Sequence, residues 1–355
     1  MEKPSIAFFD AKPYDRESFE SANSEFNFDI TFFKNHLRKD TAVLARDHNV
    51  VCAFVNDVVD KEVVDILLEN QVKLLAMRCA GYNNIDLKAL KREIRVVRVP
   101  TYSPHAVAEH SIALMLCLNR KIHRAFYRTL DNNFNINGLL GFDMHRKTVG
   151  VIGTGKIGKI LIKILKGFDM KILAYDLYQD KEYAKQLEFE YVGLDELYRQ
   201  SDIISLNCPL TKETYHMING DSLSLMKHNV MIINTGRGKL IDSKDLIDSL
   251  KKKEIGSAAL DVYEEESEYF FEDFSSEIIS DDILARLLTF PNVLITSHLG
   301  FFTREAVHNI AQTTLGNIRD FFEGRELKNE ICYKCGIDEC ARLSSGKCLY
   351  VHGDG

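Results

Sequence analysis

Three kinds of residue suited to acid–base chemistry and anion binding follow strand-like segments in the second half of the sequence. Arg237 lies in INTGRG, Glu264, Glu265 and Glu266 follow SAALD, and His298 lies in ITSHLG. Arginine offers a planar fork of donors to a carboxylate or a polarised carbonyl. Histidine can exchange a proton near neutral pH, and a carboxylate behind it stabilises the imidazolium. Together these types suit proton transfer beside a bound carboxylate or polarised carbonyl.

Each of these residues also has an ordinary interpretation. Arg237 could be a surface cation, a single histidine after a strand is more often structural, and a run of glutamates is usually a solvated surface. The joint occurrence of the three at strand ends favours chemistry, because open α/β sheets place ligand groups at the carboxyl ends of their strands. Glu264 and Glu265 keep the surface interpretation or stay undecided. The histidines His105, His110, His216 and His228 have no evident acid or metal partner in the sequence and are interpreted as structural or surface residues.

A glycine-rich segment precedes these residues. Gly153, Thr154, Gly155, Lys156, Ile157 and Gly158 spell GxGxxG between the apolar run TVGVI and the helical run KILIKILK. Glycines there permit a tight turn and close approach of the backbone to a pyrophosphate at a helix N-terminus. Asp176 ends the next predicted strand and can bind the ribose hydroxyls while repelling a 2′-phosphate, which favours NAD over NADP. The alternative is a glycine-rich turn with an unrelated aspartate.

The elements that must position these groups alternate along the chain. Short β-branched runs at 5–10, 50–56, 72–81 and 94–100 predict strands, with a helix at 61–70. A long buried helix is predicted from about 104 to 128. A second series of strands follows at 147–153, 170–176, 201–210, 229–236 and 292–297, and a final amphipathic helix at 303–323. This order predicts an α/β protein of two Rossmann-like or flavodoxin-like parallel-sheet domains flanking a cleft, with the cofactor domain inserted into the substrate domain.

Composition narrows the class of partner. The net charge of −7 and the pI near 5.9 argue against nucleic-acid or anionic-membrane binding. No apolar stretch approaches the roughly 20 residues that span a bilayer, and the N-terminal segment lacks a signal-peptide core. A cytoplasmic protein is therefore expected.

The motifs resemble those of the D-isomer-specific 2-hydroxyacid dehydrogenase family, in particular its fermentative NAD-dependent D-lactate dehydrogenases. The stretches that carry the resemblance run from about residue 5 to residue 331 and include MRCAGYNNIDL, VRVPTYSPHAVAEH, GVIGTGKIG, NCPLTKETYHMIN, INTGRGKLID, ALDVYEEE with YFFED, and SHLGFFTREA. The resemblance implies stereospecific, reversible reduction of pyruvate to D-lactate with NADH. Another small 2-keto acid, or an NAD-sensing interaction protein of the same fold, are the alternatives.

The resemblance also implies a role for each matching residue. His298 would protonate the keto oxygen, Glu266 would be its paired acid, and Arg237 would bind the substrate carboxylate. The substrate would further contact Cys79, Ala80, Gly81, Tyr102 and Phe301. Beyond the glycine-rich segment and Asp176, the cofactor would contact Cys208, Pro209, Thr235, Gly236 and Asp261.

The resemblance further implies a domain division and an assembly. Residues 1–100 and 301–331 would form the substrate domain and residues 101–300 the NAD-binding domain, and the protein would be a homodimer or homotetramer. Gly236 stands where many relatives carry serine, and Leu299 with Gly300 replaces other residues after the histidine. These departures bear on substrate preference rather than on the class of reaction.

The C-terminal segment 332–355 lies outside the resemblance. Its cysteines Cys332, Cys335, Cys340 and Cys348 are spaced C-x2-C-x4-C-x7-C. Four thiolates so close together could coordinate zinc tetrahedrally and fold a segment too short to fold alone. An iron–sulfur cluster or a redox-sensitive appendage without metal are the alternatives.

Overall fold

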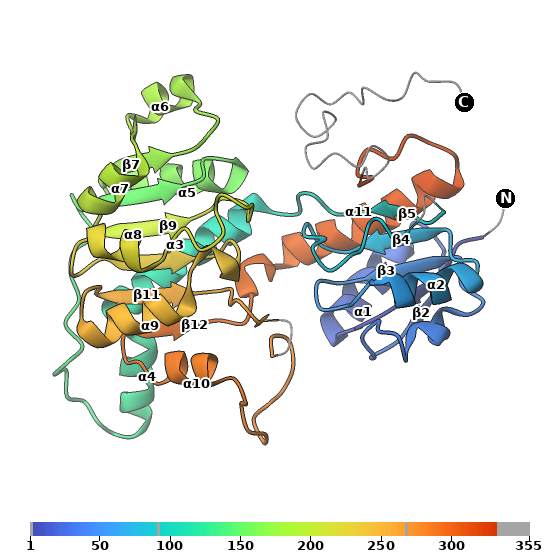
Figure 1. Ribbon diagram of the computed structural model, residues 1–355, viewed down its shortest axis with the longest axis horizontal. Helices are drawn as coiled ribbons and strands as arrows, with labels where there is room; N and C mark the ends of the chain where they lie inside the picture. The colour runs from blue at the N-terminus through green and yellow to red at the C-terminus, as the bar shows by residue number, and fades with distance from the viewer. Residues whose placement is uncertain (1–2, 91–92, 267–268, 332–355) are drawn as a thin grey trace. The chain divides into compact units, whose positions relative to one another are not determined.

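The computed structural model describes residues 3–90, 93–266 and 269–331, and the chain forms two compact units (Figure 1). One unit contains the residues up to Tyr102 together with those from Thr303 onward, and the other contains Ser103–Phe302. The chain therefore leaves the first unit once, builds the whole second unit, and returns for its last long helix.

The first unit is a five-stranded parallel sheet with the strand order β2-β1-β3-β4-β5. Its strands β3 and β4 are buried at every residue, as their continuous apolar sequences VVCA and LLAM require for central strands covered on both faces. Helices α1 and α11 pack against each other, so the last helix completes a unit begun by the first residues. The elements are β1 (Ser5–Phe8), α1 (Pro13–Asn23), β2 (Asp29–Phe32), η1 (Ala42–Ala45), β3 (Val50–Ala53), α2 (Lys61–Glu69), β4 (Leu74–Met77), β5 (Arg95–Val97) and α11 (Arg304–Phe322).

The second unit is a seven-stranded parallel sheet with the order β12-β11-β10-β9-β6-β7-β8. The order reverses between β6 and β9, and such switch points form the crevice in which α/β sheets bind ligands. Its strands are β6 (Thr148–Ile152), β7 (Lys171–Tyr175), β8 (Glu190–Tyr191), β9 (Ile203–Leu206), β10 (Met231–Asn234), β11 (Ser257–Leu260) and β12 (Val293–Ile295). Its helices are α3 (Pro104–Arg120), α4 (Ile122–Leu130), α5 (Lys156–Lys166), α6 (Lys181–Leu187), α7 (Leu194–Gln200), α8 (Gly220–Leu225), η2 (Gly238–Leu240), α9 (Ser243–Lys252), α10 (Asp282–Leu288) and η4 (Leu299–Phe301). The predicted fold class, two parallel-sheet α/β domains, is confirmed.

Helix α3 begins the second unit and is one of its organising elements. Ser103 caps it by accepting a hydrogen bond from the Ala106 amide, and Pro104 occupies its first turn. Its apolar side chains join the core formed with β6, α5 and β10. The prediction of one helix from 104 to 128 was wrong in one respect, because the chain turns at Lys121 (φ 51°) and starts a separate helix, α4.

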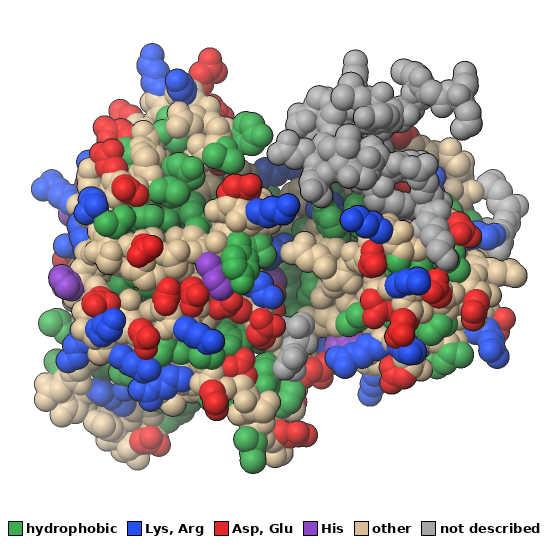
Figure 2. All heavy atoms as spheres, in the orientation of Figure 1, with side chains coloured by type: hydrophobic (Ala, Val, Ile, Leu, Met, Phe, Trp, Pro, Cys, Tyr) green, Lys and Arg blue, Asp and Glu red, His purple; other side chains and the backbone are tan. Residues whose placement is uncertain are grey.

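The surface carries side chains of both charges. On the face shown in Figure 2, basic and acidic side chains are interspersed over both units. Within the described ranges, no helix is long and apolar enough to cross a membrane.

Candidate active site

The glycine-rich loop joins β6 to α5 at the switch point of the second sheet. Gly153 has φ +95°, and a Cβ added there would lie 2.6 Å from the backbone of Asn207 at the end of β9. A Cβ at Gly158 would lie 2.0 Å from the Gly153 carbonyl oxygen, whereas a Cβ at Gly155 would meet no atom within 4 Å. The first and third glycines are therefore required by packing, and the second leaves open backbone at a helix N-terminus where a pyrophosphate can approach.

Asp176 follows β7 beside this loop. Its Oδ2 accepts hydrogen bonds from the amide and the hydroxyl of Thr154, at 2.6 and 3.0 Å, and its Oδ1 accepts one from the Tyr178 amide at 2.8 Å. The neighbouring Leu177 and Tyr178 are exposed and bring no positive charge. A fixed carboxylate without a cation fits a ribose with free hydroxyls and disfavours a 2′-phosphate. These residues fit NAD.

Other predicted cofactor residues end β9 and β10. The thiol of Cys208 lies 3.8 Å from the sulfur of Met217, and burial raises the pKa of Cys208 to about 11, so the thiol stays neutral. Thr235 shares a hydrogen bond of 2.9 Å with Ser111 of α3. The Gly236 amide donates to Asn234, and the Pro209 carbonyl accepts from the Thr214 hydroxyl.

His298 and Glu266 lie in contact, as the family resemblance implies. The Nδ1 of His298 is 3.2 Å from Oε1 of Glu266, and Oε2 of Glu266 accepts a hydrogen bond from the Tyr263 amide. The two side chains are about one-fifth exposed, at 19% and 21%. The Nε2 of His298 has no hydrogen-bond partner within residues 3–90, 93–266 and 269–331. The ring therefore has one nitrogen held by a carboxylate and one available to a ligand.

Asp261, at the end of β11, holds the segment that carries His298. Its carboxylate is buried and accepts hydrogen bonds from the amides of Leu299 and Gly300, from the Thr296 hydroxyl and from His110 of α3. Its main-chain carbonyl accepts the amide of His298 at 2.8 Å. Burial alone would raise the pKa of Asp261, but the hydrogen bonds from His110 and Thr296 bring it below its usual value.

Arg237 lies in the loop between β10 and η2. Its guanidinium donates to the carbonyl of Gly236 at 2.7 Å, and its own carbonyl accepts from the side chain of Asn234. The next residue, Gly238, packs directly against the backbone of the loop that follows β11. A Cβ added to Gly238 would lie 2.1 Å from the Tyr263 carbonyl. Across the part of the chain that the structure describes, Arg237 forms no ion pair, so its charge is available to an anion.

Two aromatic rings border His298. The ring centroid of Phe271 lies 6.1 Å from that of His298, and the ring of the buried Phe301 lies 6.5 Å from it. Phe271 belongs to the YFFED stretch and has φ 71°, which is uncommon for a bulky residue. Phe301 was predicted to contact the substrate and Phe271 was not, because the position of a residue inside an inserted loop cannot be read from periodicity.

The other two glutamates of the run also have partners. Glu264 accepts from His216 Nε2 at 2.8 Å and from the Ser243 amide, and Asp242 lies 3.3 Å from Nδ1 of the same histidine. Glu265 is more exposed and lies 3.5 Å from Lys239. Acid partners that the sequence did not reveal therefore face His110 and His216, and Glu264 contacts His216 instead of lying on a solvated surface.

The predicted substrate-binding residues of the first unit follow β4. The carbonyl of Cys79 accepts the Val99 amide, and the carbonyl of Ala80 accepts from the Arg98 guanidinium at 2.7 Å. Within the described ranges, the amides of Ala80 and Gly81 donate no hydrogen bond. Two half-buried amide donors in one loop are suited to an anion. Tyr102 ends this unit, and its carbonyl accepts from the side chain of Asn309.

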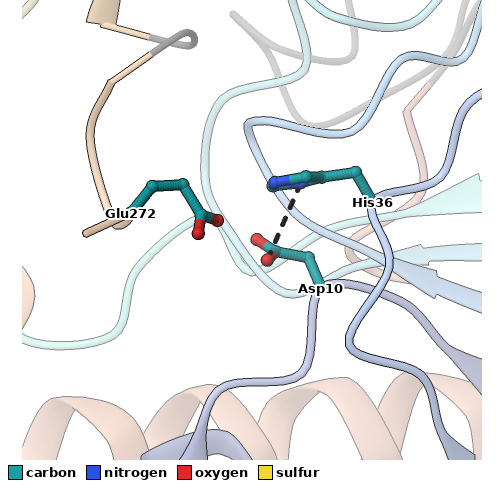
Figure 3. Close-up of side chains that lie close together, drawn as sticks. All are labelled: Asp10, His36 and Glu272. Carbon is teal, nitrogen blue, oxygen red and sulfur yellow. Dashed lines mark ion pairs between the residues drawn. The ribbon is translucent and has the colours of Figure 1, made fainter. Parts of the chain in front are cut away.

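A buried set of charges precedes that loop and was not predicted. Arg78 is 1% exposed, lies between the rings of Phe8 and Phe54, and is 3.4 Å from Asp15. It also donates to the carbonyl of Asp10 at 2.8 Å. Asp10 in turn lies 3.7 Å from Nδ1 of His36 (Figure 3).

The same set includes Asp57, which accepts the amides of Leu37 and Phe54. Burial raises the pKa of Asp57 to about 6 despite the opposing effects of Arg78 and of those amides. Arg78 thus anchors the end of β4 from which the Cys79–Gly81 loop leaves.

The proposed zinc ligands Cys332, Cys335, Cys340 and Cys348 lie outside the described residues. The cysteines that are described, Cys52, Cys79, Cys117 and Cys208, are free thiols.

Comparison with known proteins shows extensive similarity. Residues 112–300 match the family model for the D-isomer specific 2-hydroxyacid dehydrogenase NAD binding domain. A 2-hydroxyacid dehydrogenase homolog of Haemophilus influenzae is 51% identical over 325 residues, which cover 91% of this chain and 98% of that protein. The D-lactate dehydrogenase of Escherichia coli is 48% identical, covering 92% and 99%. A solved structure of the pyruvate reductase of Chlamydomonas reinhardtii superposes with a TM-score of 0.88 at 42% identity, covering 92% and 98%.

Proposed function

Because the chain belongs to the D-isomer specific 2-hydroxyacid dehydrogenase family of NAD-dependent oxidoreductases, we propose that it is a cytoplasmic D-lactate dehydrogenase that reduces pyruvate with NADH. The names of the relatives from E. coli and C. reinhardtii support this substrate. The observation that carries the chemistry is the His298–Glu266 pair, in which Nδ1 faces a carboxylate and Nε2 remains available.

His298 is the proposed acid of the reduction. NADH, when bound, supplies the hydride that reduces the carbonyl carbon of the keto acid. The imidazolium of His298 donates the proton from Nε2 to the carbonyl oxygen, which becomes the hydroxyl of the product. Glu266 stabilises that imidazolium and fixes the ring, because its other oxygen is held by the Tyr263 amide. In the reverse direction neutral His298 removes the hydroxyl proton.

Arg237 is proposed to bind the substrate carboxylate. A guanidinium without an ion pair can form two parallel hydrogen bonds to a carboxylate, and it also polarises the neighbouring carbonyl. The amides of Ala80 and Gly81, together with Cys79 and Tyr102, are proposed as further substrate contacts in the domain formed by residues 1–100 and 301–331.

The size of the substrate is proposed to depend on Phe271 and Phe301. The rings of both lie within about 7 Å of the His298 ring. A methyl group, as in pyruvate, suits such a site better than a branched side chain would.

We also propose a homodimer or homotetramer. The side chains of Ile122, Phe126, Tyr127 and Leu130 on α4 are all more than half exposed. Contiguous apolar side chains of this kind mark protein–protein contacts more often than solvent-facing surface. Light scattering on the purified protein would measure the mass, and a monomer would contradict this proposal.

One assay tests the proposed activity. NADH oxidation would be followed with pyruvate, oxaloacetate, glyoxylate and hydroxypyruvate in parallel, with chiral analysis of the product. We expect pyruvate to give the highest kcat/KM and D-lactate to be the product. A preference for another acid would change the substrate assignment. The absence of turnover with all four would contradict the enzymatic proposal and favour an NAD-sensing protein.

A further inference from the structure

His110 lies in the middle of α3 and reaches the buried carboxylate behind His298. Its Nε2 is 3.1 Å from Oδ1 of Asp261 and 3.3 Å from Oγ1 of Thr296. Asp261 follows β11 and Thr296 follows β12, so a single imidazole contacts the ends of two strands. Helix α3 also packs on η4, the turn formed by Leu299–Phe301.

The segment that His110 supports has an unusual backbone conformation. His298 itself has φ 55° and ψ 45°, the left-handed region that residues other than glycine seldom adopt. Such a conformation is strained and persists only where surrounding contacts impose it. Most of these backbone contacts come from one residue, since Asp261 accepts the amides of His298, Leu299 and Gly300, while the Thr296 carbonyl also accepts the His298 amide at 3.1 Å.

The carboxylate of Asp261 is tightly packed and buried. A Cβ at Gly300 would lie 2.9 Å from its Oδ2 and 3.7 Å from the ring of His110. The carboxylate has an exposed fraction of only 2%, so its charge depends on the donors around it. Burial raises the pKa of Asp261, but the hydrogen bonds that it accepts lower that pKa below its usual value. Among these hydrogen bonds the one from His110 has the largest effect, followed by the one from Thr296.

We propose that His110 is a positioning residue for the reaction: by donating from Nε2 to Asp261 it keeps that carboxylate in place, and thereby holds His298 in the left-handed conformation that aims its ring. The inference rests on the proposed role of His298 as the acid. In this proposal His110 contacts neither substrate nor cofactor. His110 acts on the reaction only by positioning Asp261, which in turn holds the backbone of residues 298–300.

Two variants with side chains of similar length distinguish the effect of the hydrogen-bond donor of His110 from the effect of its shape. In His110→Gln the amide can place an N–H near the position of Nε2, whereas His110→Met has a similar length and no donor. His105→Met is the matched control, because His105 is exposed in the first turn of the same helix. His298→Gln is measured in parallel. Thermal unfolding establishes that each variant is folded before its kinetics are compared.

Two readouts apply to every variant. Steady-state kinetics give kcat and the KM for NADH, and hydrogen–deuterium exchange gives the protection of the peptide that spans residues 296–302. We expect His110→Met to lower kcat by roughly 10- to 100-fold, since small misplacements of catalytic groups have effects of that size. Its KM for NADH should change by less than about threefold. Exchange at Leu299 and Gly300 should be faster in the same variant, and His110→Gln should restore most of both properties.

Other results would overturn the inference. Unchanged kcat with unchanged exchange in His110→Met would remove any role for the donor, and equal losses in the Gln and Met variants would assign the effect to shape. A loss of kcat without faster exchange would mean that His110 acts elsewhere. If the unmodified protein turns over no keto acid, the proposed function fails, while the exchange comparison still determines whether His110 holds the His298 segment.

Discussion

Glu264 and Glu266 are two residues apart in the sequence, and each contacts a histidine. The two histidine–glutamate pairs differ in whether the second ring nitrogen of the histidine also has a partner. His298 pairs with Glu266 at 3.2 Å and His216 pairs with Glu264 at 2.8 Å. The exposed fractions are nearly equal, and both histidines have a positive φ, 55° and 49°. In His216, however, both ring nitrogens face carboxylates, because Asp242 lies 3.3 Å from Nδ1.

The difference shows that a histidine beside a carboxylate is not sufficient for catalysis. A ring held at both nitrogens is a cross-link, since it has no donor left for a ligand. His216 joins the loop after β9 to the loops that follow β10 and β11, and its own amide donates to the Lys239 carbonyl. His298 keeps Nε2 available among the described residues, which suits proton transfer.

The largest expected effect comes from His298→Gln. Glutamine keeps an amide donor but cannot release a proton, so kcat should fall by roughly 10²- to 10⁴-fold, the usual contribution of a general acid. Fluorescence titration with NADH should show unchanged affinity, because the dinucleotide loop lies at Gly153–Gly158. Turnover close to that of the unmodified protein would contradict the assignment of the acid.

Glu266→Gln should have the next largest effect. Glutamine keeps an acceptor for the Tyr263 amide but carries no charge to stabilise the imidazolium that gives up the proton. We therefore expect kcat for keto-acid reduction to fall by roughly 10- to 100-fold, with the KM for NADH changed by less than about threefold. Steady-state kinetics would measure both constants, and an unchanged kcat would separate Glu266 from the reaction.

Glu264→Gln should affect stability more than turnover. It removes one of two carboxylates from His216 while keeping an acceptor for the Ser243 amide, so the free energy of unfolding should fall by about 1–2 kcal/mol. Chemical denaturation would measure this change. The kcat should stay unchanged, and a loss of kcat as large as that of Glu266→Gln would mean that the wrong pair was assigned to catalysis.

Glu265→Gln is the matched control and should have the smallest effect. Its carboxylate is 57% exposed and its partner Lys239 is 42% exposed, so solvent screens the pair. The free energy of unfolding should change by less than about 0.5 kcal/mol and the kinetics should not change. Any strong kinetic effect would imply that the whole glutamate run, rather than one member, contributes to the reaction.

Local patterns made part of this molecule predictable. The apolar runs located most of the strands, and the glycine spacing of GTGKIG located a loop whose first and third glycines allow no Cβ. These features depend on neighbours in the chain, where side-chain type and period are informative. The choice of Glu266 within the glutamate run came instead from the resemblance to the 2-hydroxyacid dehydrogenases, and Glu266 does contact His298. The turn at Lys121 escaped prediction because helical composition continues through it.

The sequence by itself determined the order of elements, the dinucleotide motif and the residue types available for proton transfer. Only the tertiary structure decided which acids His110 and His216 meet. His110 and Asp261 are 151 residues apart, and His216 and Glu264 are 48 apart. The order β12-β11-β10-β9-β6 brings the ends of the strands and the side of α3 together. Such pairings follow from strand order and helix packing, which no local period encodes.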